Sequence, residues 1–121
     1  MTTKIFKIAH NRGKPRVWME GKFLLNAGIT TGMKFARLMP NPQTDIETDA
    51  NTMVLRFLSW GSHTVAGTDK RPIIDLNGAY LNQIFEGFTH YEAEITGMHM
   101  TFDHEKDGQF REEIFITGVN Q

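Results

Sequence analysis

The chain contains an internal repeat, and the second copy follows the first by 57 residues. Residues 15–38 and 72–95 align without a gap. The matched pairs are Pro15/Pro72, Val17/Ile74, Met19/Leu76, Gly21/Gly78, Phe23/Tyr80, Leu24/Leu81, Ala36/Ala93 and Leu38/Ile95. Two copies are fewer than a solenoid needs to bury a continuous core. They suit a closed domain whose halves are related by a pseudo-two-fold axis, as two subunits are in a homodimer.

Local patterns in the first copy predict strands joined by a short helix. Alternating apolar and polar residues favour a half-buried strand over residues 3–9, and residues 10–13 have the composition of a turn. The expected elements that follow are a strand at 16–19, a short helix at 22–27 ended by Gly28, a strand at 33–39 and its hairpin partner at 52–58. Residues 40–51 carry two prolines and three acids and read as a long exposed loop.

In the second copy, strand 89–95 is expected to turn at Thr96-Gly97 directly into strand 98–103. That copy is expected to have no counterpart of the 40–51 loop, and residues 112–117 are expected to form a closing strand. We therefore predict a mostly β fold with short helices. The expected organisation is a single domain, residues 1–121, built from two β-α-β-β repeats (about 15–58 and 72–104) with flanking strands.

Composition narrows the class of protein. The chain has 121 residues, enough for one hydrophobic core, and it has no cysteine, which excludes disulfides, thiol catalysis and zinc sites built on cysteine. No apolar run reaches the length of a membrane span, and no signal-peptide pattern follows the first lysines. We expect a cytoplasmic protein with no cofactor.

Charge is divided unevenly along the sequence. Residues 1–40 contain eight Lys or Arg and one acid, whereas residues 41–121 contain five basic and thirteen acidic residues. The two segments therefore have charges of +7 and −8, although the whole chain has a net charge of only −1. Such asymmetry suggests a polyanionic partner for one face, and the alternative is that the two segments attract each other within the fold.

The first copy also carries the spacing of glycines and apolar residues that is typical of a known family. Its run Pro15-x3-Met19-x-Gly21-Lys22-Phe23-Leu24-x2-Ala27-Gly28-Ile29-Thr30-x-Gly32 resembles the core motif of SymE-like proteins, which are similar to the AbrB/MazE superfamily of swapped-hairpin β-barrels. Phe23 stands where the family usually has tryptophan. The resemblance covers about half of the chain. It implies a pseudo-two-fold barrel in which both half-barrels lie on one polypeptide, and it implies DNA binding.

The resemblance places DNA contacts in the loop before the second strand and at the start of that strand. The matching positions are Arg12, Lys14 and Arg16, and in the second copy they are Asp69, Arg71 and Ile73. This difference argues against palindromic recognition. Arginine can bind phosphate or read guanine through its forked donors. The expected DNA-binding residues are Lys7, His10, Arg12, Lys14, Arg16, Lys22, Lys70 and Arg71.

Other residue types give weaker indications. His99 and His104 are poorly spaced for a shared metal site, so we expect no metal. The acids Asp103, Glu105, Asp107, Glu112 and Glu113 could in principle support hydrolysis, but no nucleophile motif or phosphate-binding loop accompanies them. Trp18 aligns with Asp75 in the repeat, so it is either exposed for a protein or base contact or packed in the core.

The resulting hypothesis is a non-catalytic protein that binds double-stranded DNA, with a regulatory or antitoxin-like role and the acidic segment facing away from the DNA. The main alternative is a small, phage-type inhibitor or accessory factor that binds a protein through its acidic face or the 40–51 loop. An RNA-cleaving toxin is a third possibility. The chain would act as a monomer, being a pseudo-dimer already, or as a homodimer.

Overall fold

The computed structural model describes residues 2–40, 51–96, 99–101 and 109–120. Within these ranges the chain is mostly β with short helices, which confirms that part of the sequence prediction. The elements of the first copy are β1 (Thr2–Lys7), β2 (Ala9–Asn11), β3 (Lys14–Glu20), α1 (Lys22–Leu25), β4 (Lys34–Leu38) and β5 (Thr52–Phe57). Those of the second are β6 (His63–Thr64), β7 (Ala66–Thr68), β8 (Arg71–Asn77), η1 (Ala79–Leu81), α2 (Asn82–Phe85), β9 (His90–Ile95), β10 (His99–Thr101), β11 (Gln109–Arg111) and β12 (Glu113–Val119).

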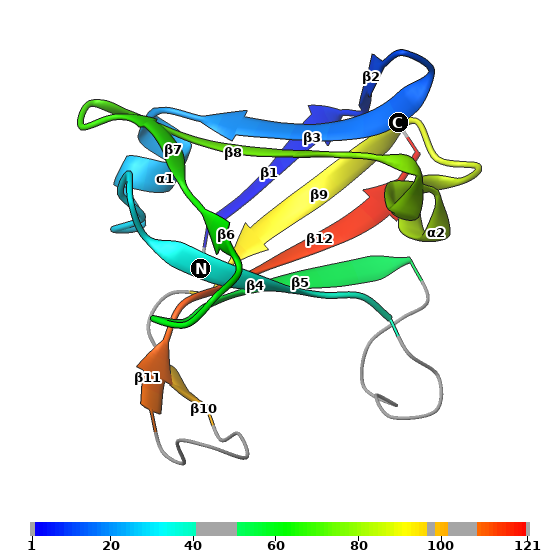
Figure 1. Cartoon of the computed structure of the whole chain (residues 1–121). Coiled ribbons are helices and arrows are strands. Elements are labelled where there is room, and N and C mark those ends of the chain that lie inside the picture. Colours follow the sequence, from blue (N-terminus) through cyan, green and yellow to red (C-terminus); the bar gives the residue numbers. More distant parts are fainter. Residues whose placement is uncertain (1, 41–50, 97–98, 102–108, 121) are drawn as a thin grey trace.

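Two antiparallel sheets enclose the core. The larger sheet has the strand order β1-β9-β12-β5-β4-β6, and the smaller sheet has the order β2-β3-β8-β7. Figure 1 shows β3 and β8 running above the strands of the larger sheet. The chain passes from one sheet to the other between β1 and β2 and again between β6 and β7. The residues at these two bends, Ile8 and Val65, are both buried.

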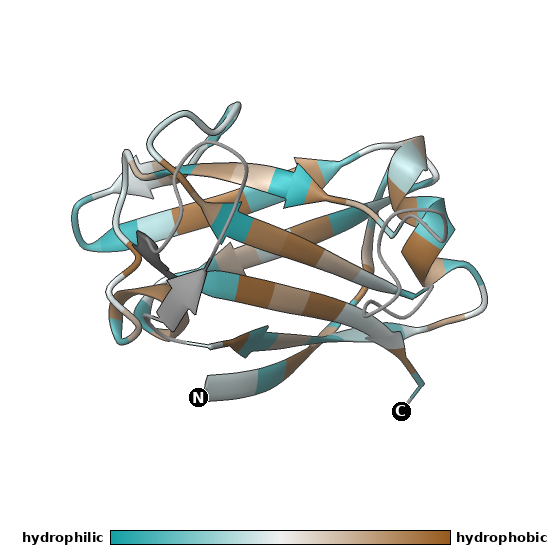
Figure 2. Ribbon diagram, turned by 90° about the horizontal axis from the view of Figure 1, so that it is seen from below, coloured by the Kyte–Doolittle hydropathy of each residue, from teal (hydrophilic) through white to brown (hydrophobic). Residues whose placement is uncertain are grey.

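Apolar residues fill the space between the sheets. From the smaller sheet the buried side chains include Val17 and Met19 on β3, and the larger sheet contributes Leu55 on β5 and Ile116 on β12. Figure 2 views the molecule from below and shows apolar segments along the central strands. Burying a side chain of this size stabilises the fold by roughly 1.5–3 kcal/mol, so this layer accounts for much of the folding free energy.

The strand registers repeat with the period of the sequence. Ala9 lies opposite Arg16, and Ala66 lies opposite Ile73, so each pair is reproduced 57 residues later. The same shift relates two backbone hydrogen bonds at the ends of the central strands. The Gly21 N–H donates to the Pro72 carbonyl at 3.1 Å, and the Gly78 N–H donates to the Pro15 carbonyl at 3.4 Å. The equivalent strands of the two copies are β1 and β6, β2 and β7, β3 and β8, β4 and β9, and β5 and β12. Replacing each strand by its equivalent reverses the strand order of both sheets, so the halves are related by a pseudo-two-fold axis.

The gapless alignment is wrong beyond the helices. Val65 donates its N–H to the Met33 carbonyl and Ile8 donates to Thr89, so β9 is shifted by 56 residues from β4. The buried Phe35 therefore corresponds to the buried Tyr91. The predicted pairs Ala36/Ala93 and Leu38/Ile95 join residues of opposite faces, since Leu38 is 38% exposed and Ile95 is buried.

The expected hairpin of residues 89–95 and 98–103 is also wrong. Strand β9 pairs with β1 and β12, whereas β10 pairs with β11 in a separate two-stranded sheet. The final strand of the second copy is therefore β12, and residues 96–112 connect it to β9. This connection is the counterpart of the 39–51 segment, so the second copy does have a long insertion at this position.

The first strand differs from its prediction in burial. Strand β1 ends at Lys7, and in it only Phe6 is partly buried, because β1 is an edge strand of the larger sheet. The predicted half-buried strand 3–9 therefore combines an exposed edge strand with the bend at Ile8 that leads into β2. The period-two pattern cannot distinguish these cases, since an edge strand has the same side-chain alternation as an interior one.

Candidate nucleic-acid interface

The outer face of the smaller sheet is formed by the residues that alternate with the core positions of β3 and β8. Val17, Met19, Ile74 and Leu76 point inward and are buried. Successive side chains of a strand point to opposite faces. The outer face therefore carries Lys14, Arg16, Trp18 and Glu20 from β3, and Arg71, Ile73, Asp75 and Asn77 from β8.

One end of this face is the turn between β2 and β3. Asn11 lies opposite Lys14, so Arg12 and Gly13 form a two-residue turn, and both have positive φ angles of 55° and 78°. Positive φ at both central positions is what a type I′ turn requires, and Asn-Gly is the preferred pair there. Arg12 is the one non-glycine residue with positive φ in the described part of the chain. An exposed arginine thus occupies a position for which its backbone is poorly suited.

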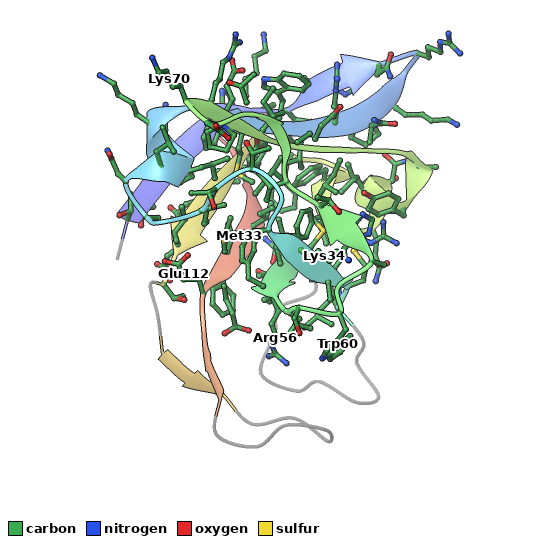
Figure 3. The ribbon with its side chains drawn as sticks, turned by 60° about the vertical axis from the view of Figure 1, so that its left-hand side comes forward. Met33, Lys34, Arg56, Trp60, Lys70 and Glu112 are labelled. Atoms are coloured by element: carbon green, nitrogen blue, oxygen red, sulfur yellow. The ribbon has the colours of Figure 1, made fainter. Side chains whose placement is uncertain are left out.

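The opposite end carries Lys22, Lys70 and Arg71. Lys70 lies in the turn between β7 and β8, and Figure 3 shows it on the side of the molecule away from Arg56 and Trp60. The bond between Gly21 and Pro72 brings the start of α1, where Lys22 is exposed, to the same end. The Arg71 side chain is 62% exposed and its Nε donates to Glu20 Oε2 at 2.7 Å.

The centre of the face is a linked group of side chains on the pseudo-two-fold axis. Trp18 lies opposite Asp75, and these positions are 57 residues apart, so the axis passes between them. Arg16 donates from Nε to Asp75 Oδ1 at 2.8 Å and from Nη2 to Oδ2 at 2.9 Å. Its guanidinium also lies 4.6 Å from the centroid of the Trp18 ring. The hydrogen bonds from Arg16 lower the pKa of Asp75, so this carboxylate stays charged well into the acidic range.

Two predicted residues lie away from this face. Lys7 ends β1 in the larger sheet, where it lies opposite His90. His10 is exposed on β2 opposite Pro15, whose side chain points inward, so His10 does not join Arg16 on the outer side. The structure therefore divides the predicted set into two groups at the ends of the β3–β8 pair, with Arg16 between them, and leaves Lys7 and His10 outside.

The acids of the second half that lie in the described ranges do not form a separate face. Each sheet takes strands from both halves of the chain, so Asp75 lies on β8 beside the cations of the first half, and Asp69 lies in the turn between β7 and β8. The expectation that the acidic half faces away from the DNA-binding cations therefore fails for Asp75, which lies among them. Charges that are separated along the sequence need not be separated in space when both halves of the chain contribute strands to the same sheet.

Of the carboxylates and histidines near the C-terminus, the structure describes the side chains of Glu112 and Glu113. Glu113 is buried and accepts a hydrogen bond from Arg56 Nε at 2.8 Å on the larger sheet. Glu112 is also buried, and burial raises the pKa of its carboxyl. Asp103, Glu105, Asp107 and His104 lie outside the described residues, as does the side chain of His99. Among the described residues no three His, Asp or Glu are grouped to hold a metal ion.

Comparison with known proteins does not assign the chain to a family. No protein-family model, curated protein or solved structure matches it. The likeness to SymE and AbrB proteins therefore remains a prediction from the sequence. In the described ranges, no helix is both long enough and apolar enough to cross a bilayer.

Sequence reasoning missed the ion pairs that hold the two arginines of this face. Neither the Arg16–Asp75 pair nor the Arg71–Glu20 pair was anticipated. The repeat itself contains a signal for the first pair. Residues that are equivalent by a two-fold face each other across an antiparallel strand pair only where the axis passes between them, and the register of β3 and β8 places that point at Trp18 and Asp75.

Proposed function

We propose that this protein binds double-stranded DNA, without catalysis, through the outer face of its smaller sheet. The observation that carries the proposal is the position of the cations: Arg12 and Lys14 lie at one end of the β3–β8 pair, and Lys22, Lys70 and Arg71 lie at the other. At about 3.3 Å per residue, Lys14 and Arg71 lie roughly 25 Å apart along the strands, which corresponds to about seven base-pair steps. Because β3 and β8 are the central strands of a four-stranded sheet, the sheet would lie across the groove and its outward side chains would reach the DNA.

The backbone at Arg12 gives independent support. Strained conformations tend to persist where function requires the side chain. Arginine at a position that favours asparagine is explained by a need for its charge at the tip of the turn, where it projects beyond the sheet toward a phosphate.

The pseudo-two-fold registers support the finer proposal of a fused swapped-hairpin barrel of the AbrB type. They relate the halves as the resemblance implies, with β3 and β8 in one layer. The cations of the two ends differ, since Arg12 corresponds to Asp69 and Arg16 to Ile73. We therefore propose an asymmetric footprint and a regulatory or antitoxin-like role.

The proposal is tested by removing two cations from one end. The double variant Arg12→Gln/Lys14→Gln is titrated against a fluorescent duplex of random sequence at several salt concentrations. Each phosphate contact contributes about −0.9 to the slope of log K against log salt, so the variant should lose close to two units of slope and bind more weakly at low salt. The matched control is Lys4→Gln/Lys34→Gln, which removes the same charge from the larger sheet and should leave the slope near that of the wild type. Equal slopes for all three proteins, or no binding by the wild type at low salt, would reject the proposal.

A second candidate function is protein binding through the larger sheet. Three large apolar side chains are exposed there or beside it: Ile5 at 42%, Leu38 at 38% and Trp60 at 52%. Figure 3 shows Trp60 on the opposite side from Lys70. Exposed tryptophan is enriched at protein interfaces. This surface and the outer face of the smaller sheet can therefore bind separate partners.

A further inference from the structure

Arg16 is held on two sides by its neighbours on the outer face. Asp75 fixes the edge of the guanidinium through the bonds from Nε and Nη2, at 2.8 and 2.9 Å, and the Trp18 ring supports its plane. Asn77, two residues further along the same face of β8, also lowers the pKa of Asp75. A long side chain normally has many rotamers, so this arrangement lowers the conformational entropy that binding would otherwise cost.

The bonds to Asp75 leave the end of the guanidinium free. Arginine has five N–H donors, and Asp75 accepts from the one on Nε and from one of the two on Nη2. The second Nη2 hydrogen and both Nη1 hydrogens have no partner among the residues that the structure describes. The Arg16 side chain is 32% exposed. Its end-on pair of donors is thus fixed in direction and open to solvent.

The charge around this fork favours a neutral acceptor over a phosphate. Asp75 is ionised at neutral pH, as an aspartate normally is, Arg16 lowers its pKa further, and its side chain is 31% exposed. It offsets the charge of Arg16 and repels an anion placed beside it. The major-groove edge of guanine offers two neutral acceptors, O6 and N7, at the spacing of an arginine fork. Lys14 and Arg12, which form no ion pair among the described residues, are better suited to phosphate contact.

We propose that Arg16 reads a guanine from the major groove, and that Asp75 and Trp18 are positioning residues that aim it. This inference rests on the proposed duplex binding and specifies which DNA sequences the protein would prefer. The second copy has Ile73 at the position of Arg16, so each molecule presents one such fork. The DNA site should accordingly contain one strongly required guanine in an asymmetric sequence.

The test uses three pools of random-sequence duplexes that differ only at guanine. One pool contains guanine, one contains 7-deazaguanine, which lacks the N7 acceptor, and one contains hypoxanthine, which keeps N7 and O6 and lacks the minor-groove amino group. A bidentate contact provides about 1–3 kcal/mol of discrimination. We therefore expect the wild type to enrich its best sequences from the guanine and hypoxanthine pools, and to bind their 7-deaza counterparts about tenfold more weakly.

Two variants distinguish the effect of positioning the Arg16 fork from the effect of its charge alone. Arg16→Lys keeps the charge and loses the fork, so it should bind all three forms of the best sequence within about twofold of one another. Asp75→Asn should reduce the guanine preference severalfold while leaving binding to the 7-deaza duplex unchanged or tighter, since it removes a negative charge. A merely structural role for Asp75 would weaken binding to every duplex alike. Arg56→Lys, which alters the matched Arg56–Glu113 pair on the larger sheet, is the control and should keep the wild-type preference.

Spectroscopy provides a second readout. The chain has two tryptophans, so Trp60→Phe leaves Trp18 as the only indole. In that background guanine-containing DNA should change the Trp18 emission more than the 7-deaza duplex does at equal occupancy. Duplex binding with no loss on 7-deaza substitution, or a guanine preference that survives Arg16→Lys, would overturn the inference. The absence of duplex binding at low salt would instead remove the proposed function on which the inference depends.

Discussion

Arg12 has a strained backbone conformation and a proposed role in DNA binding. Its φ of 55° lies in the left-handed region, which costs an L-residue with a long side chain roughly 1–2 kcal/mol and which asparagine tolerates better. Glycine follows it, so the turn is one substitution away from the favoured Asn-Gly pair. A residue that breaks a local preference without a visible structural gain is expected at a functional site.

Replacing Arg12 should therefore separate stability from binding. We expect Arg12→Asn to raise the free energy of unfolding by about 0.5–1 kcal/mol, because it relieves backbone strain, and to weaken duplex binding, because it removes a cation. Arg12→Gln is the matched control: it loses the same charge and keeps the strain, so only binding should change. Urea unfolding and DNA titration of the three proteins measure both quantities. A loss of stability in Arg12→Asn would contradict this account of the turn.

Single residues could be predicted from sequence only in part. The cations at positions 12, 14 and 16 were assigned to one strand and the turn before it, and β3 and its turn bring them close in space. The neutralisation of Arg16 was missed, because Asp75 lies 59 residues away and is brought near only by strand pairing. The structure places Lys7 in a different sheet from the other cations, since the bend at Ile8 separates β1 from β2.

The strands were predicted well where turns and periodicity agree, and poorly where a second strand-like segment competes for the same partner. The positions of β4, β5 and β12 follow from their apolar patterns. The partner of β9 could not be found in the same way, because 96–112 separates it from β12 and a nearer segment also has strand-like composition. The one-residue shift between β4 and β9 inverts every face assignment along the strand, as a slip of one residue always does.

The β7–β8 pair provides a test of how the smaller sheet is held together. Gly67 has a φ of 97°, and a Cβ placed there would lie 2.1 Å from the Arg71 carbonyl oxygen. Gly13, in the β2–β3 turn, also has positive φ, but a Cβ there meets no atom within 4 Å. Both changes to alanine cost roughly 1–2 kcal/mol of backbone strain. Gly67→Ala should cost at least about 1 kcal/mol more, because backbone must move to relieve the overlap.

Chemical unfolding of the two glycine variants measures this difference. Amide hydrogen exchange should also show loss of protection in β7 and the adjoining part of β8 for Gly67→Ala and not for Gly13→Ala. Equal destabilisation of the two variants would mean that the close contact at Gly67 does not hold β7 against β8.

The molecule as a whole is organised by its two-fold axis. On the smaller sheet the axis passes between Trp18 and Asp75. On the larger sheet Phe35 lies opposite Phe57 and Tyr91 lies opposite Gly118, so β5 and β12 are related by a shift of 61. The axis therefore passes between Val54 and Phe115, which lie opposite each other. The proposed DNA-binding face lies around one end of the axis, and its asymmetry comes from side chains that differ between the copies.

The uneven distribution of charge along the sequence does not produce a matching separation of Asp75 from the cations in space. It indicated that residues 1–40 supply most of the cations, and these residues do supply Arg12, Lys14, Arg16 and Lys22. It could not show that β8 brings Asp75 into their midst, because that placement depends on how the halves interleave. Electrostatic steering should consequently be modest, and the arrangement of individual cations should matter more than net charge.

The most direct test of the proposed interface is a map of backbone amide chemical shifts in the intact protein as duplex DNA is added at low salt. The account predicts large shifts at residues 9–20 and 66–77, strongest near Arg12, Arg16 and Lys70, with the outer positions of β4, β5 and β12 almost unchanged. Shifts concentrated on the larger sheet around Trp60, with the smaller sheet silent, would contradict it.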